Sequence, residues 1–93
     1  MKILFKETFI LRLERQLHYI SLDSTGRARK FKSGLFQRIR SIPSNPYSFR
    51  KSMYFDDESI RDLTYKGYTI VFRITGNAIE VFGFVKHQQG PVD

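Results

Sequence analysis

Four side chains in the last third of the chain have the chemistry to act on a phosphate group. They are Arg61, Arg73, Lys86 and His87. Arginine and lysine are cations at neutral pH that can bind phosphate oxygens, whereas histidine titrates near neutrality and can donate or accept a proton. Because the segments that carry them read as strands of one sheet, we expect the histidine and the arginines to converge at one end of that sheet.

Each of the four residues also has a purely structural interpretation. Arg73 is placed to form an ion pair with Glu80, and Arg61 can form one with the acids near it in the sequence. Lys86 is typical of a solvated edge strand, and His87 of a frayed chain end. The sequence leaves both interpretations open.

Two of these residues, Arg73 and Lys86, lie on the strands of a predicted β-hairpin around Gly76-Asn77, and His87 follows it. A two-residue loop that begins with glycine favours a type II′ turn, whose twist matches that of its strands. With this loop, the register places apolar residues opposite apolar residues and opposite charges across from each other. The predicted pairs are Thr75 with Ala78, Ile74 with Ile79, Arg73 with Glu80 and Phe72 with Val81.

Alternation along this hairpin assigns its side chains to two faces. The predicted core face carries Tyr68, Ile70, Phe72, Ile74, Ile79, Val81 and Val85. The predicted outer face carries Thr69, Val71, Arg73, Glu80, Phe82, Phe84 and Lys86. Three of these, Val71, Phe82 and Phe84, are too apolar for a solvated surface, so either a second layer covers them or they form a patch for a partner.

The composition excludes several classes of protein. A chain of 93 residues makes a single domain, expected over residues 1–88, with a flexible tail over residues 89–93. With no cysteine and two histidines, we expect no disulfide, metal site or cofactor. No segment is apolar for long enough to be a signal peptide or a membrane span, which favours a cytoplasmic protein without a membrane partner. The net charge of +7 and the pI near 10.0 favour an acidic or polyanionic partner.

Two amphipathic helices are predicted after a short strand at residues 2–6. The first begins with Thr8 as its N-cap and repeats apolar residues at Phe9, Leu13, Leu17 and Ile20. The second spans residues 24–42 and repeats Ala28, Phe31, Leu35, Ile39 and Ile42. A link as short as this one favours an antiparallel helical hairpin.

The second predicted helix is unusual in its charge. It carries six cations and no acid, namely Arg27, Arg29, Lys30, Lys32, Arg38 and Arg40. A run of charges is usually a solvated face, but six uncompensated cations also favour contact with phosphates or with an acidic protein segment.

Further strands are predicted at residues 49–55 and 60–65, the second of which turns at Lys66-Gly67 into the hairpin. Consecutive strands with short links form a mostly antiparallel sheet, and a helical hairpin buries its apolar stripes on one face of that sheet. The predicted fold class is therefore α+β, with an antiparallel (mixed) sheet and an N-terminal helical hairpin, in the order β-α-α-β-β-β-β.

This order, together with four sequence segments, resembles the RelE/ParE superfamily of toxins from bacterial type II toxin–antitoxin systems. The segments are LFQRIRSIPSNP at residues 35–46, IRDL at 60–63, GYTIVFRI at 67–74 and IEVFGFVKH at 79–87. The resemblance covers almost the whole chain. It implies a small growth-inhibiting toxin neutralised by a cognate acidic antitoxin, for which Val71, Phe82 and Phe84 are the expected docking surface.

The superfamily implies two different cellular targets. RelE-like members cut messenger RNA, usually in the ribosome; in such a member His87 is the acid or base, and the phosphate partners are Arg61, Arg73 and Lys86. ParE-like members instead inhibit DNA gyrase. We favour the mRNA endonuclease because of the expected convergence, with non-catalytic gyrase inhibition as the alternative. A third interpretation, outside the superfamily, is a basic nucleic-acid-binding domain.

Two features depart from the nuclease pattern. RelE-like nucleases often carry an arginine after the Gly-Tyr of the penultimate strand, where this chain has Thr69. Many also have a tyrosine near the C-terminus, and this chain ends without one. The sequence therefore leaves the completeness of a nuclease centre open.

Overall fold

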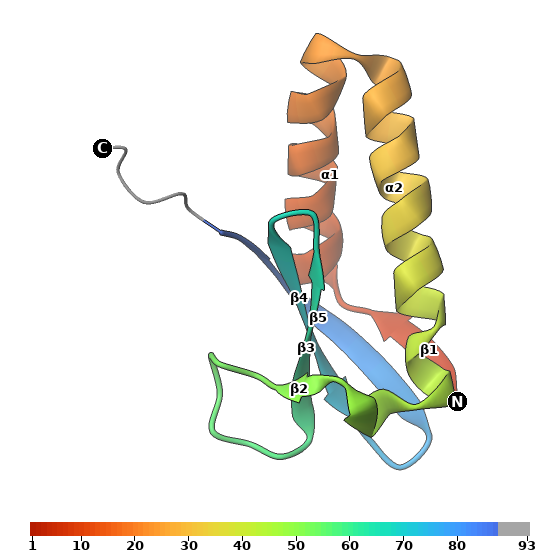
Figure 1. Ribbon diagram of the computed structural model, residues 1–93, viewed down its shortest axis with the longest axis vertical. Helices are drawn as coiled ribbons and strands as arrows, with labels where there is room; N and C mark the ends of the chain where they lie inside the picture. Colours follow the sequence, from red (N-terminus) through yellow and green to blue (C-terminus); the bar gives the residue numbers. More distant parts are fainter. Residues whose placement is uncertain (88–93) are drawn as a thin grey trace.

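One five-stranded sheet with two long helices against it makes up the protein, seen in a computed structural model that describes residues 1–87 (Figure 1). The elements are β1 (Lys2–Phe5), α1 (Glu7–Asp23), α2 (Thr25–Arg40), β2 (Arg50–Lys51), β3 (Ile60–Tyr65), β4 (Tyr68–Ile74) and β5 (Ala78–Lys86). Two 3-10 turns, Ile42–Ser44 and Pro46–Ser48, follow α2. The predicted α+β class and order are confirmed. The predicted flexible tail, residues 89–93, lies outside the described residues.

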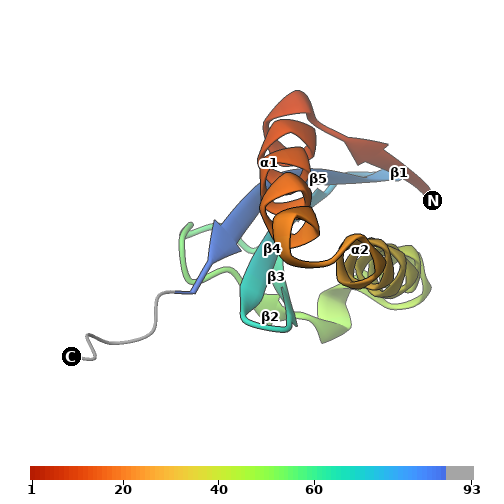
Figure 2. The same cartoon turned by 90° about the horizontal axis from the view of Figure 1, so that it is seen from above.

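The sheet is mixed, with the strand order β1-β5-β4-β3-β2. The first strand pairs in parallel with β5, and all other neighbours are antiparallel. The view from above shows the two helices next to each other against the twisted sheet (Figure 2). Because β1 pairs with β5 only from Ala78 to Val81, the second half of β5 has no strand neighbour on that side among residues 1–87.

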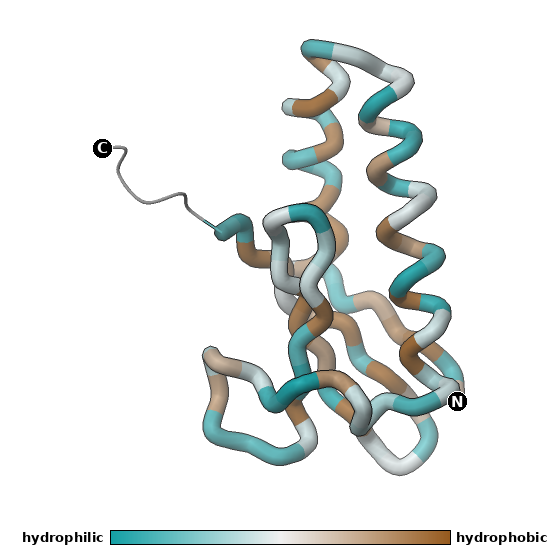
Figure 3. Tube along the Cα trace, viewed as in Figure 1, coloured by the Kyte–Doolittle hydropathy of each residue, from teal (hydrophilic) through white to brown (hydrophobic). Residues whose placement is uncertain are grey.

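A single apolar core fills the space between the helices and the sheet. Hydrophobic and hydrophilic stretches alternate along both helices, as helical spacing requires (Figure 3). Phe9 and Leu35 have no exposed surface, and the same holds for Phe72 of β4. The helices contribute Phe9, Leu13, Phe31, Leu35 and Ile39, and the strands contribute Leu63, Tyr68, Ile70, Phe72, Ile74, Ile79, Val81 and Phe84.

Both helices begin close to their predicted positions. The first has Lys6, not Thr8, at its N-cap, and Glu7 in its first turn places a negative charge near the positive end of the helix dipole. The second begins after Ser24, whose hydroxyl accepts a hydrogen bond from the backbone N–H of Arg27 at 3.1 Å. It ends at Arg40, two residues earlier than predicted, because Pro43 follows in a 3-10 turn.

The two hairpin turns differ in how they close. Lys66 and Gly67 both have positive φ, at 47° and 85°, which is the geometry of a type I′ turn. At Gly76-Asn77 the predicted register is confirmed, but the predicted type II′ turn is wrong because Gly76 does not have the positive φ it requires. Here the Thr75 hydroxyl accepts the Ala78 N–H at 3.1 Å, in place of a backbone carbonyl.

Candidate functional site

The four candidate phosphate-binding and proton-transfer residues lie at two different ends of the sheet. Lys86 is paired with Tyr68 at one end of β4, with His87 next to it. Arg73 lies five residues further along β4 than Tyr68, and at about 3.3 Å per residue this corresponds to roughly 17 Å. Arg61 pairs with Phe72, near Arg73. The expected convergence at one end of the sheet is therefore wrong.

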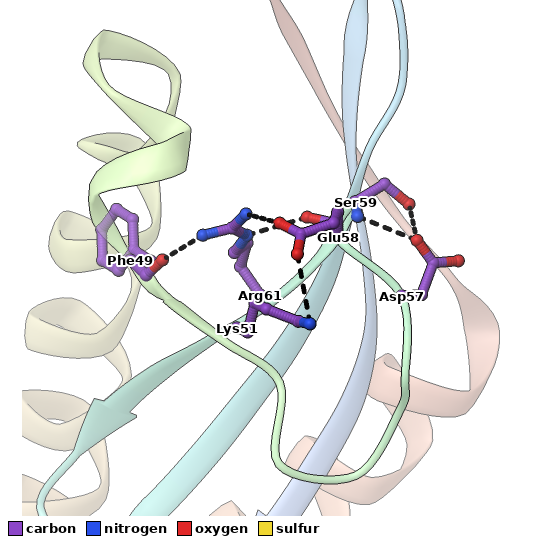
Figure 4. Close-up of polar contacts among 6 residues, drawn as sticks. All are labelled: Phe49, Lys51, Asp57, Glu58, Ser59 and Arg61. Atoms are coloured by element: carbon purple, nitrogen blue, oxygen red, sulfur yellow. Dashed lines mark hydrogen bonds and ion pairs between the residues drawn. The ribbon is translucent and has the colours of Figure 1, made fainter.

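Arg61 is held by groups of the protein itself (Figure 4). Its Nε and Nη2 atoms donate to the carbonyl and carboxylate oxygens of Glu58 at 2.9 and 3.1 Å, and Nη1 donates to the carbonyl of Phe49 at 3.1 Å. The guanidinium lies 4.9 Å from the centre of the Tyr47 ring, and only 12% of the side chain is exposed. Arg61 thus ties the chain after α2 to the start of β3, as its structural interpretation predicts.

The acidic link before β3 takes part in the same network (Figure 4). Lys51 forms a second ion pair with Glu58, at 3.2 Å. Asp57 accepts hydrogen bonds from the hydroxyl and the backbone N–H of Ser59 at 2.7 and 2.8 Å. These bonds favour the ionised carboxylate and lower the pKa of Asp57.

Arg73 lies exposed on the other face of the sheet. It stands opposite Glu80 in the register, yet no Arg73–Glu80 ion pair within 4.0 Å occurs among the described residues. Its guanidinium instead lies 5.7 Å from the centre of the Phe82 ring, a cation–π arrangement. The predicted cross-strand position is confirmed, and the predicted charge contact is replaced by one to an aromatic ring.

His87 and Lys86 diverge from each other at the end of β5. The His87 backbone N–H donates to the carbonyl of Gly67 at 2.9 Å, and its Nε2 atom lies at hydrogen-bond distance from the Thr69 hydroxyl. Lys86 reaches toward α1, where its Nζ atom lies 5.8 Å from the centre of the Tyr19 ring. His87 therefore has a threonine beside it rather than the two predicted arginines.

A β-bulge changes which residues of β5 face the helices. Val71 pairs with Gly83 and Phe72 with Val81, so Phe82 is an extra residue in β5. Past this point the alternation is reversed. Phe84 is only 6% exposed and stacks on Tyr68 with ring centres 5.0 Å apart.

The predicted placement of Phe84 on the outer face is therefore wrong. Its ring also meets the edge of Phe9, from α1, at 6.0 Å. Val85, predicted for the core, is half-buried outside the core cluster. The sequence did contain a signal, because a glycine inside a strand often marks a bulge or a close approach. At Gly83 an added Cβ atom would lie 2.9 Å from that of Val71.

The outer face is partly covered by residues 52–59, which we call the covering loop. Its Phe55 meets the Phe82 ring edge-on with the centres 5.6 Å apart. Val71 is almost fully buried beneath this contact, whereas Phe82 is half-buried. Beside them lies the outer groove, about 290 Å³ in volume and lined by Thr8, Arg12, Tyr54, Phe55, Val71, Phe82, Gly83 and Val85.

A buried carboxylate anchors the covering loop. Asp62 Oδ2 accepts the backbone N–H of Met53 at 3.0 Å and lies 3.7 Å from an Arg50 nitrogen. The Ser52 N–H donates to the carbonyl of Ile60 at 2.9 Å. Because the chain turns to Asp62 at this point, the strand predicted at residues 49–55 is reduced to Arg50–Lys51. Met53, Tyr54 and Phe55 are left exposed on the loop.

No candidate metal site occurs among the described residues. Residues 1–87 contain no group of three or more histidine, cysteine or acidic side chains placed to hold a metal ion. Among the helices described, none has the length and hydropathy to cross a membrane. Burial raises the pKa of the Tyr68 phenol above its ordinary value.

The sequence matches a toxin family, and the fold matches a solved structure. A family model described as the ParE toxin of the type II toxin–antitoxin system parDE matches residues 3–91. The chain belongs to the ParE toxin family. The resemblance to the RelE/ParE superfamily is thereby confirmed. A solved structure described as a chromosomal ParDE toxin–antitoxin system from P. aeruginosa is similar over 95% of this chain and 97% of that chain, with a TM-score of 0.76.

The structural similarity concerns the fold of this ParE-family chain, since the sequence identity to the P. aeruginosa chain is 15%. No curated protein matches the sequence. The toxin's surface therefore has to be interpreted from its own residues. Of the residues that line the outer groove, the sequence predicts Val71 and Phe82 for the outer face. It does not predict Tyr54, Phe55 or Val85 there, because residues 53–55 read as a strand and the bulge at Phe82 is not evident from the alternation.

Proposed function

We propose that this ParE-family toxin inhibits DNA gyrase and has no RNA-cleaving centre. The family match over residues 3–91 carries the proposal, because ParE-like members of the superfamily are the gyrase inhibitors and RelE-like members the nucleases. Our preferred prediction from sequence, an mRNA endonuclease, depended on four residues that the fold separates.

The geometry supports the same choice. Metal-free RNA cleavage needs a base for the ribose hydroxyl, an acid for the leaving oxygen and cations on the phosphate, all within hydrogen-bond reach of one substrate. His87 lies at one end of β4 and Arg73 at the other, about 17 Å away by strand spacing. The Arg61 guanidinium is engaged with Glu58 and Phe49. A single phosphate cannot contact all of these groups.

We further propose that an acidic antitoxin binds the outer groove. Phe55, Phe82 and Val85 offer an apolar surface, and the exposed cations Arg12 and Arg73 lie beside it. An extended segment can also use the second half of β5, whose edge lacks a strand neighbour among residues 1–87. An antitoxin segment with acidic residues between apolar ones matches this combination of surfaces.

Induction of the toxin in bacterial cells tests the target. The expected result is growth arrest with induction of the DNA-damage response, unchanged in the His87→Ala variant, while total mRNA persists during the first minutes. Rapid mRNA loss that His87→Ala abolishes contradicts the proposal. The same variant serves as the control, because His87 is exposed and its removal leaves the core intact.

A further inference from the structure

The net charge of this protein comes entirely from one segment. Residues 24–55 contain no acid and eight cations, namely Arg27, Arg29, Lys30, Lys32, Arg38, Arg40, Arg50 and Lys51. The rest of the chain carries the other eight cations and all nine acids, a net charge of −1. The charge of +7 is therefore a local property of α2 and the chain that follows it, rather than a general feature of the surface.

Three of these eight cations have acidic partners. Arg27 pairs with Asp23 at 2.5 Å, Arg50 lies 3.7 Å from Asp62 and Lys51 pairs with Glu58 at 3.2 Å. The other five all belong to α2, and no ion pair to any of them occurs within residues 1–87. These five, which we call the α2 cations, are Arg29, Lys30, Lys32, Arg38 and Arg40.

The helix itself gains little from this charge. Arg38 and Arg40 suit the negative C-terminal end of the helix dipole. Arg29 and Lys32 lie beyond the first turn of the helix, so they gain nothing from the helix dipole. Their spacing of three residues also brings like charges together, which opposes helix formation. Intrahelical interactions therefore do not account for these two cations, which leaves a solvated face or a bound anion as their role.

The α2 cations lie along a rod that a long polyanion can follow. Sixteen residues give α2 a length of about 24 Å. Arg29, Lys32 and Arg40 share one face with Phe36, at spacings of three and four residues, and they line a shallow hollow of about 320 Å³. Figure 1 shows α2 on the outer flank of the helical hairpin, with α1 on its other side. Arg29, Lys32 and Arg40 are all exposed, so a ligand can reach this cationic face.

We propose that the cations of this face, Arg29, Lys32 and Arg40, bind the phosphate backbone of double-stranded DNA. The face fits a uniformly charged backbone better than a protein segment, because its one large apolar residue, Phe36, is half-buried and already packs on Phe5 at 5.3 Å. The choice of duplex DNA over RNA rests on the proposed function, since gyrase acts on duplex DNA. By holding the DNA next to gyrase, α2 raises the local concentration of the toxin at its target.

Fluorescence anisotropy with a labelled duplex of about 30 base pairs, titrated between about 50 and 200 mM KCl, tests the proposal. The variant Arg29→Gln/Lys32→Gln is compared with Lys6→Gln/Arg15→Gln, which removes the same charge from exposed positions outside α2. We expect the first variant to bind more weakly and to reduce the slope of log K against log salt by about two. The control variant is expected to retain the wild-type slope.

Three results overturn the proposal. They are the absence of duplex binding at low salt, equal loss of affinity in the two variants, and tighter binding of single-stranded RNA or poly-glutamate than of duplex DNA. The damage response in cells reports gyrase inhibition independently. If the toxin triggers the damage response without binding DNA, gyrase inhibition stands and DNA binding by α2 is refuted. If it binds DNA through α2 without triggering the response, DNA binding stands and gyrase inhibition is refuted.

Discussion

The two faces of the sheet are built from similar residues but are closed to different degrees. On the face toward the helices, Phe84 packs against Tyr68 and Phe9 and is only 6% exposed. On the other face, Phe82, two residues away, meets only Phe55 of the covering loop and the Arg73 guanidinium among the ring contacts described for residues 1–87. Apolar side chains covered by the helices thus stabilise the core. Those covered only by the loop stay partly exposed, as a binding surface requires.

The largest effect is expected from Phe84→Asp. Removing this ring and burying a carboxylate in the core should lower the free energy of unfolding by about 4 kcal/mol or more. Urea denaturation followed by circular dichroism measures the loss. A variant that folds with wild-type stability but no longer binds antitoxin shows that Phe84 belongs to the outer face after all.

A smaller loss is expected from Arg61→Gln on the helix-covered face. The substitution removes charged hydrogen bonds to Glu58 and Phe49 and should cost about 1–3 kcal/mol. Arg73→Gln, on the exposed face, is the matched control and should change stability by about 0.5 kcal/mol or less. If thermal denaturation shows equal losses of stability in the two variants, Arg61 has no greater structural role than Arg73.

The substitution Gly83→Ala tests the β-bulge in β5, which reverses the side-chain alternation of that strand. The new Cβ atom would meet Val71 at 2.9 Å, and the overpacking should cost about 1–3 kcal/mol. In a Val71→Ala background the cost of Gly83→Ala should fall, which a double-mutant cycle measures. Additive effects of the two changes contradict the close approach of Gly83 to Val71.

A change in stability of only about 1 kcal/mol is expected from Phe82→Asp, since the ring is only half-buried. Its effect on antitoxin binding should be larger, a loss of about 2 kcal/mol in affinity measured by calorimetry. Tyr19→Asp, at an exposed aromatic on α1, is the control and should bind normally. Undiminished binding by the Phe82 variant removes the outer groove from the docking surface.

Much of the fold could be predicted because local signals agreed with each other. The 3.6-residue period gave both helices, and pairing of Arg73 with Glu80 and of Phe72 with Val81 fixed the hairpin register. The prediction of a type II′ turn at Gly76 was wrong because the loop is closed by the Thr75 hydroxyl rather than by a glycine with positive φ.

The site was harder to predict because it depends on contacts between distant segments. A single extra residue at Phe82 reverses the alternation and moves Phe84 into the core, and period-two reasoning has no means of detecting it. Likewise, the Glu58 partner of Arg61 is a sequence neighbour and could be predicted, whereas the bond to the Phe49 carbonyl, twelve residues away, could not be read from the local sequence.

The supercoiling reaction of purified gyrase tests the central claim most directly. The protein and its His87→Ala variant are added in equal amounts to gyrase with relaxed plasmid, and in parallel to translating ribosomes with a labelled mRNA. The proposed function predicts equal inhibition of supercoiling by both proteins and intact mRNA. Unimpaired supercoiling together with mRNA cleavage that His87→Ala abolishes contradicts it.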